Sequence, residues 1–286
     1  MWPVLFLLVA VSAQHQSALV AYKQHKFADA VVQFTEALKT EQPGTAEHQE
    51  SVLFLGQSLF LETKYADAIP WLEKATGGSS PLPEAAYMLG NACILTQQNE
   101  RAVKAFARLF QVSPDSAAAH LITAQMMWHK DLETEAAKQA RIALEIDARI
   151  PEAHFLLGEV AINHADFEGG IEEFKKEIAV NPGFAMAHYR LGDAYGRLER
   201  WDEAMAPLER SVWLNPNFSG PFILLGEGYL KRNELANAEG VLRHAVLLDP
   251  QNVSAHYMLG QTLRQENKPE DARKEFDRLR ELKGNN

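Results

Sequence analysis

The hydrophobic and polar positions of residues 49–286 recur with a period of 34 residues. Gly192, for example, is matched by Gly158, Gly226 and Gly260. Seven blocks of this length fill the segment, and they begin at Gln49, Pro83, Ala117, Pro151, Ala185, Ser219 and Val253. The eighth place of a block is Gly in six of the seven blocks and Ala124 in the other. Since Gly makes up roughly 7% of residues in general, chance would give this on the order of 10⁻⁶ of the time. A fixed period in this range predicts a stacked array of identical units.

Within a block, the spacing predicts two amphipathic helices. In the fourth block they are expected from Pro151 to about His164 and from Phe167 to Val180, where Asn181-Pro182 ends the second helix. The fourth, seventh, eighth and eleventh places fall on one helical face. Gly in the middle of a helix costs about 1 kcal/mol relative to Ala, so its recurrence requires a gain elsewhere. We expect that gain to be the close approach of the partner helix, at Ala204 and its counterparts.

The fifth block resembles a known repeat. It carries His188, Leu191-Gly192, Tyr195, Trp201, Ala204, Leu208 and Pro216 at the spacing of the tetratricopeptide repeat (TPR), and the resemblance covers about 275 of the 286 residues. The resemblance implies an all-α, right-handed superhelical solenoid of antiparallel helix hairpins that binds proteins or peptides without catalysis. The expected repeats are 14–44, 49–82, 83–116, 117–150, 151–184, 185–218, 219–252 and 253–286.

Two segments and two prolines depart from the regular pattern. Residues 15–44 form a divergent first repeat, and Thr45–His48 are a four-residue insertion before the strict register begins. Pro70 and Pro207 fall in the second turn of second helices, where Pro removes a hydrogen bond, so a kink or a late helix start is expected at each.

The N-terminal run Met1–Ala13 is apolar and ends in Val11-Ser12-Ala13. It resembles a short secretory signal cleaved before Gln14. If the signal is genuine, we expect a secreted or periplasmic protein, and without it a cytoplasmic one. The alternatives are a wrongly assigned start or the remnant of a preceding helix. No apolar run reaches the roughly 18–20 residues that span a bilayer, so no transmembrane segment is expected.

Composition and motifs narrow the function classes. A net charge of −10 disfavours nucleic-acid binding, which relies on clustered Lys and Arg. The single cysteine, Cys93, fits a buried apolar position. His120, His154, His188 and His256 recur at multiples of 34 residues, but adjacent repeats lie about 10 Å apart, too far to share a zinc ion. We therefore expect rings wedged between neighbouring hairpins, and no catalytic, cofactor or metal site.

The face opposite the Leu-Gly positions is the candidate binding surface, because the resemblance places it on the concave side. The first helices of repeats two to five are apolar nearly all round, which favours a groove for an amphipathic or extended peptide. Its predicted residues are Leu53, Phe60, Tyr87, Leu121, Trp128, Phe155, Ile162, Tyr189, Arg190, Asp193, Arg197, Lys231 and Tyr257.

Other interpretations of this face stay open. Its aromatic residues could pack on each other along the stack, or the face could bury against a second copy of the chain. Arg190, Arg197 and Lys231 could hold an acidic segment or a terminal carboxylate. The carboxylate clamp of chaperone-binding TPR proteins is not expected, since Asn91 has Tyr87 where that clamp needs Lys.

Overall fold

A computed structural model describes residues 13–78 and 82–284, and these residues form helices and turns without strands. The predicted signal segment lies outside the described residues except for Ala13, which begins the first helix. The helices are α1 (Ala13–Lys23), α2 (Phe27–Ala37), α3 (Ala46–Leu61), α4 (Tyr65–Thr76), α5 (Pro83–Leu95), α6 (Asn99–Leu109), α7 (Ala117–Trp128), α8 (Glu133–Ile146), α9 (Ala153–Asn163), α10 (Phe167–Val180), α11 (Ala185–Arg197), α12 (Trp201–Leu214), α13 (Ser219–Lys231), α14 (Leu235–Leu248), α15 (Val253–Gln265) and α16 (Pro269–Gly284).

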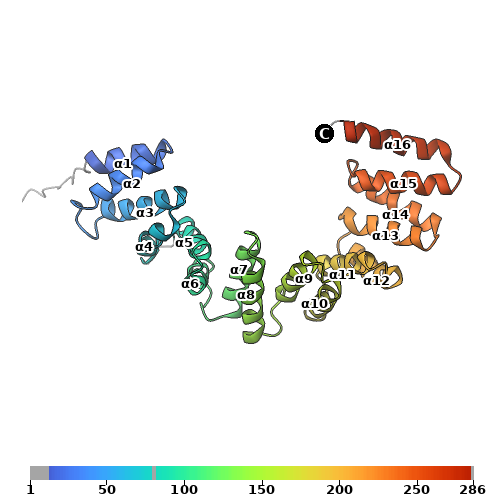
Figure 1. Ribbon diagram of the computed structural model, residues 1–286, viewed down its shortest axis with the longest axis horizontal. Helices are drawn as coiled ribbons and strands as arrows, with labels where there is room; N and C mark the ends of the chain where they lie inside the picture. Colours follow the sequence, from blue (N-terminus) through green and yellow to red (C-terminus); the bar gives the residue numbers. More distant parts are fainter. Residues whose placement is uncertain (1–12, 79–81, 285–286) are drawn as a thin grey trace, which may run out of the picture. The chain divides into compact units, whose positions relative to one another are not determined.

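The chain divides into two units, 1–147 and 148–286, which carry α1–α8 and α9–α16 (Figure 1). In each unit consecutive helices pair into hairpins, and the second helix of a hairpin packs on the first helix of the next. First helices also contact one another, α3 with α1 and α5, and α13 with α11 and α15. In each unit, we call the surface formed by the first helices of the hairpins the first-helix face; these helices are α1, α3, α5 and α7 in the first unit and α9, α11, α13 and α15 in the second. The expected all-α hairpin architecture is confirmed.

The turn inside every hairpin uses a left-handed residue that is not glycine. In the second hairpin Thr63 has φ +60°, and the N–H of Lys64 donates to the carbonyl of Leu59 at 2.9 Å. This is the Schellman arrangement that closes a helix C-terminus. The corresponding residues of the other hairpins are His25, Gln97, Asp131, Ala165, Glu199, Asn233 and Asn267. The same turn therefore closes each described hairpin, and the sequence does not reveal it because none of these residues is Gly, which usually marks such a turn.

The repeated glycines lie against a large side chain of the partner helix. A Cβ atom built on Gly192 would lie 2.5 Å from the side chain of Leu208, whereas Ala204 approaches only through its carbonyl oxygen at 3.4 Å. The predicted close approach at Ala204 is therefore present, but the most crowded contact is with Leu208, four residues later. Where Ala124 replaces Gly, that later place holds Ala140, and both residues are fully buried. Small and large side chains are thus matched between the two helices.

The start of α9 differs from the prediction. Pro151 lies outside the helix, which begins at Ala153, and Glu152 has φ +72°. The fully buried Glu177 of α10 explains the shift, because its carboxylate accepts hydrogen bonds from the backbone N–H groups of Glu152 at 2.8 Å and Phe155 at 3.3 Å. The side chain thereby caps α9 from the partner helix. The predicted span of α10, Phe167–Val180, is confirmed.

The prolines do not delay their helices. Helices α4 and α12 continue through Pro70 and Pro207, so the expectation of a late start is wrong. In each helix the neighbouring positions are anchored in the core: Leu72 beside Pro70 and Leu208 beside Pro207 are fully buried. Among the described residues, no helix has the length and apolar character that crossing a membrane requires.

Candidate functional site

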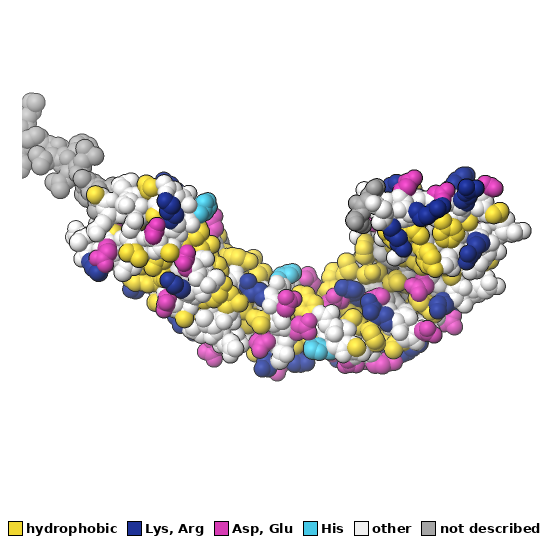
Figure 2. Space-filling view, turned by 45° about the horizontal axis from the view of Figure 1, so that its top comes forward, with side chains coloured by type: hydrophobic (Ala, Val, Ile, Leu, Met, Phe, Trp, Pro, Cys, Tyr) yellow, Lys and Arg dark blue, Asp and Glu magenta, His cyan; other side chains and the backbone are white. Residues whose placement is uncertain are grey.

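The fifth residue of each block lies on the first-helix face, but its exposure varies along the chain. Tyr87 and Tyr257 are 47% and 48% exposed, whereas Leu121 is buried at 8%. Leu53, Phe155 and Tyr189 are half-buried. The apolar surface at this place therefore differs from repeat to repeat, and Figure 2 shows hydrophobic side chains exposed in patches among charged ones.

In the second unit, aromatic pairs fill the space beside two of these positions. The ring of Phe155 lies 5.0 Å from that of Phe184, and the ring of Tyr189 lies 4.9 Å from that of Phe218, both edge to face. Phe184 and Phe218 are the N-cap residues of α11 and α13. Packing along the stack, the alternative that the sequence left open, therefore accounts for Phe155 and Tyr189.

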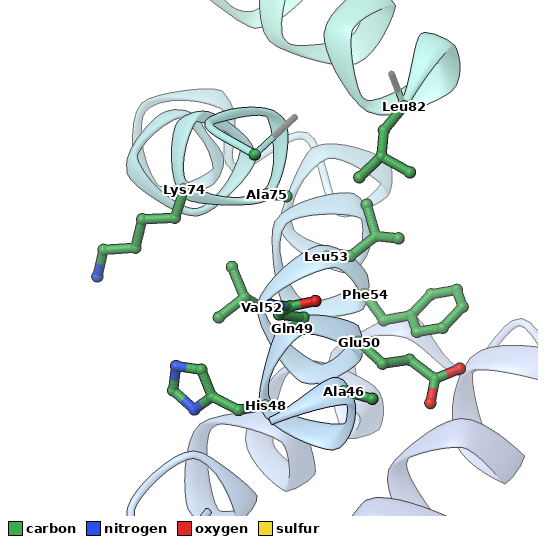
Figure 3. Close-up of a pocket in the computed structure, with 11 residues that line it drawn as sticks. Ala46, His48, Gln49, Glu50, Val52, Leu53, Phe54, Lys74, Ala75 and Leu82 are labelled. Carbon is green, nitrogen blue, oxygen red and sulfur yellow. The ribbon is translucent and has the colours of Figure 1, made fainter. Parts of the chain in front are cut away.

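In the first unit, the equivalent place is open. Leu53 and Leu82 occupy the positions that hold ring pairs in the second unit, and their side chains point toward each other in Figure 3. A cavity of about 790 Å³ lies there. Its lining is Ala46, His48, Gln49, Glu50, Val52, Leu53, Phe54, Lys74, Ala75, Gly78 and Leu82. This volume is in the range of about 300–1,000 Å³ that is usual for ligand sites.

The predicted residues at the twelfth place turn toward their own hairpins. Phe60 packs on Tyr65 of α4 with ring centroids 5.3 Å apart, and Ile94 is only 2% exposed. Ile162 lies over Gly170 of α10, where a Cβ atom would come within 2.6 Å of it. Trp128 is half-buried. Phe60 and Ile162 thus pack against their own hairpins, whereas Trp128 keeps part of its side chain exposed.

The charged residues of the second unit pair with one another. Arg190 donates to Glu159 at 2.7 Å, and Arg197 donates to Asp193 at 3.1 Å. Burial raises the pKa of the Glu159 carboxyl, while the charge of Arg190 acts in the opposite direction. Because both arginines already have carboxylate partners, the structure disfavours their holding an acidic segment. Lys231 is exposed at the end of α13.

The periodic histidines bond to the second helix of their own hairpin or to the turn that precedes their first helix. Nδ1 of His154 and Nδ1 of His256 each lie 2.6 Å from a carboxylate of the second helix, those of Glu173 and Glu275. His188 has Pro207 at the corresponding place, and its Nε2 lies 3.1 Å from the carbonyl oxygen of Pro182. Burial lowers the pKa of His188. His188 and His256 are buried and also contact the turn of the preceding repeat, at Pro182 and Pro250, so these contacts do not contradict the prediction of rings between neighbouring hairpins.

The sequence predicted a buried apolar position for Cys93. Cys93 is fully buried, and burial raises its pKa to about 11, which suits an inert thiol.

Trp213 and Leu247, at the same place of successive second helices α12 and α14, are 69% and 73% exposed. The sequence analysis did not single them out, because it searched only the first helices for binding residues.

Comparison with known proteins agrees with this architecture. The tetratricopeptide-repeat family model matches residues 15–83, 87–153, 155–217 and 223–286. The chain belongs to the tetratricopeptide-repeat family. A curated TPR relative, the TPR repeat-containing protein YpiA of Bacillus subtilis (strain 168), is 25% identical over 168 residues. That match spans 58% of this chain but only 38% of the relative's length.

Solved TPR structures show the same fold at low identity. MamA from Desulfovibrio magneticus RS-1 matches with a TM-score of 0.55 and 23% identity, covering 60% of this chain and 97% of that one. YrrB, described as a TPR protein with an unusual peptide-binding site, matches with a TM-score of 0.56 and 22% identity, covering 63% and 93% of the two chains. TPR proteins are generally scaffolds for protein interaction, and nothing here points to enzymatic activity.

Proposed function

We propose that this TPR protein binds an apolar segment of a partner protein on the first-helix face of its first unit. The cavity beside Leu53 and Leu82 carries this proposal. Where the second unit fills the equivalent places with its own rings, the first unit leaves about 790 Å³. An aromatic or large aliphatic side chain of a peptide fits that space, and Tyr87 offers a half-exposed ring on the next first helix.

The polar rim of the cavity supports a peptide over a free hydrophobic molecule. Glu50 and Lys74 line it together with the apolar residues, and Figure 3 shows their side chains extending from different helices, α3 and α4. Such groups orient a peptide, whose apolar side chain supplies the buried area while its polar atoms face charge and water.

A peptide selection tests the proposal. Random peptides displayed on phage are selected on the immobilised chain, and one enriched peptide is measured by fluorescence anisotropy. Leu53→Glu, which places a charge in the cavity, is expected to weaken binding at least tenfold. Leu247→Glu is the matched control, because Leu247 is exposed on a second helix of the other unit. Equal binding by wild type and both variants would refute this location.

Self-association is the second candidate function, favoured by the exposed ring of Tyr87 and the partly exposed Trp128 and Phe155 of repeats two to five. Light scattering after size exclusion distinguishes it. A monomer at micromolar concentration would end the idea, and a tight dimer that Trp128→Ala and Phe155→Ala leave intact would place its interface elsewhere.

An extracytoplasmic assembly is the proposed setting, and it rests on the resemblance of residues 1–13 to a secretory signal. Mass spectrometry of the N-terminus of the protein made in an export-competent cell tests it. A mature chain beginning at Gln14 supports the proposal, and an intact Met1 contradicts it.

A further inference from the structure

A cluster of potential metal ligands lies at the start of the first unit, and one of its members, His48, also lines the cavity of the proposed peptide site. His15 comes from α1, Glu41 from the turn between α2 and α3, and Glu47 and His48 from the first turn of α3. We propose that these four residues bind one divalent transition-metal ion, with zinc as the best fit to two imidazoles and two carboxylates.

The geometry brings three ligands to one point. A ligand atom from each of His15, Glu41 and Glu47 can be chosen so that all three lie within 4.8 Å of one another. Ligands about 2.0–2.2 Å from a tetrahedral zinc ion are about 3.3–3.5 Å apart. Small side-chain rotations therefore place all three on a single ion.

Two further atoms point to the position of the ion. Oε2 of Glu41 and Nδ1 of His48 are buried and have no hydrogen-bond partner in the described part of the chain, although they lie 3.9 Å apart. That separation is too long for a hydrogen bond and somewhat longer than the roughly 3.3–3.5 Å between ligands of a tetrahedral zinc ion, so a small side-chain rotation would bring both atoms to one ion. The Glu41 side chain is only 2% exposed, so its carboxylate oxygen is costly to leave uncompensated. An ion between the two atoms would satisfy both.

The surroundings of His15 favour a cation on its Nδ1 atom. This atom lies 3.2 Å from the Glu41 carboxylate and 2.7 Å from the Ser51 hydroxyl, which itself donates to Glu41. Nε2 of His15 lies 2.9 Å from the Glu50 carboxylate. If Nε2–H donates to Glu50, the ring is held as in the carboxylate–histidine–zinc arrangement, and Nδ1 faces the ion. The competing explanation is an Nδ1–H group that donates to Ser51 and Glu41 without a metal ion.

The insertion in the sequence acquires a role from this cluster. Thr45–His48 break the 34-residue register, and two of the four ligands, Glu47 and His48, belong to them. The proposed ion joins α1 to α3, and so fixes the first hairpin to its neighbour.

Zinc titration of the full chain tests the proposal. The protein is stripped with EDTA, dialysed and titrated with zinc chloride by calorimetry, and bound zinc is counted by mass spectrometry after gel filtration. We expect one equivalent of zinc and a higher unfolding temperature in its presence. Glu41→Gln and His48→Gln should each weaken binding by about 10- to 100-fold or more. Glu173→Gln, which changes the carboxylate beside His154 in the second unit, should bind as wild type.

The results of the titration distinguish a bound zinc ion from a cluster held only by hydrogen bonds. Absence of binding at micromolar zinc, or binding that both ligand variants retain, would overturn the proposal and leave a hydrogen-bonded cluster without a metal ion. If Glu41→Gln does not fold, His48→Gln decides the result, since the His48 side chain is 24% exposed and its loss disturbs the core least.

Discussion

Gly90 of α5 and Phe106 of α6 pack so closely that a Cβ atom on Gly90 would lie 2.4 Å from the phenyl ring. Gly90→Ala gains about 1 kcal/mol of helix propensity but forces the buried ring to move, and overpacking of this kind typically costs about 1–3 kcal/mol. Since the gap is far below contact distance, we expect a net loss of about 1–2 kcal/mol in the free energy of unfolding, measured by urea denaturation.

Gly240 provides the control for that substitution. It is exposed within α14, and no described atom lies within 4 Å of the position where its Cβ would be. Gly240→Ala should therefore stabilise the protein by about 0.5–1 kcal/mol. Equal effects of the two substitutions would contradict close packing as the reason for the repeated glycines.

The carboxylate of Glu177 is expected to be a major determinant of stability in the second unit. Glu177→Ala removes the acceptor of two backbone N–H groups, at Glu152 and Phe155, and each unpaired group costs about 1–3 kcal/mol when buried. We expect a loss of about 2–4 kcal/mol in thermal or urea unfolding.

Ser211, at the same place in the next repeat, gives a comparison for Glu177. Its hydroxyl donates one hydrogen bond to the carbonyl of Ala185 at 2.9 Å. Ser211→Ala should cost about 0.5–1.5 kcal/mol, less than Glu177→Ala. A smaller effect at Glu177 than at Ser211 would show that the carboxylate does not cap α9 in solution.

Acid should weaken the link between the last two repeats. Hydrogen bonds from Lys268, and then from Arg243, outweigh partial desolvation and lower the pKa of Glu239 to about 2 from 4.5. A carboxyl with a lowered folded-state pKa contributes its full stabilisation above its unfolded pKa, and loses it as the pH falls from about 4.5 to about 2. The stability difference between wild type and Glu239→Gln should therefore be largest near neutral pH and shrink over that interval. A difference that does not change with pH would contradict this pairing.

The sequence predicted the hairpins because their determinants are local and repeated. The period, the glycines and the helix-ending prolines such as Pro182 each act within one block, so they can be read from spacing alone. The features that were missed depend on contacts between distant residues. Glu177 caps a helix that begins 24 residues before it, and His15 of the first hairpin contacts Glu50 of the second.

The binding face illustrates the same limit. Spacing placed Leu53 and Phe155 at equivalent positions, but their environments differ because of the residue at the end of each block, Leu82 in one and Phe184 in the other. Whether an apolar residue on this face is accessible to a partner thus depends on the size of the side chain at the end of its block. The 34-residue period does not determine that size.

Hydrogen–deuterium exchange of the full chain, with and without a peptide selected for binding, tests the central claim most directly. Binding in the cavity of the first unit predicts slower exchange in α3 and at the start of α5, with α12 and α14 unchanged. Protection confined to α12 and α14, where Trp213 and Leu247 are exposed, would contradict the account and move the binding surface to the second helices.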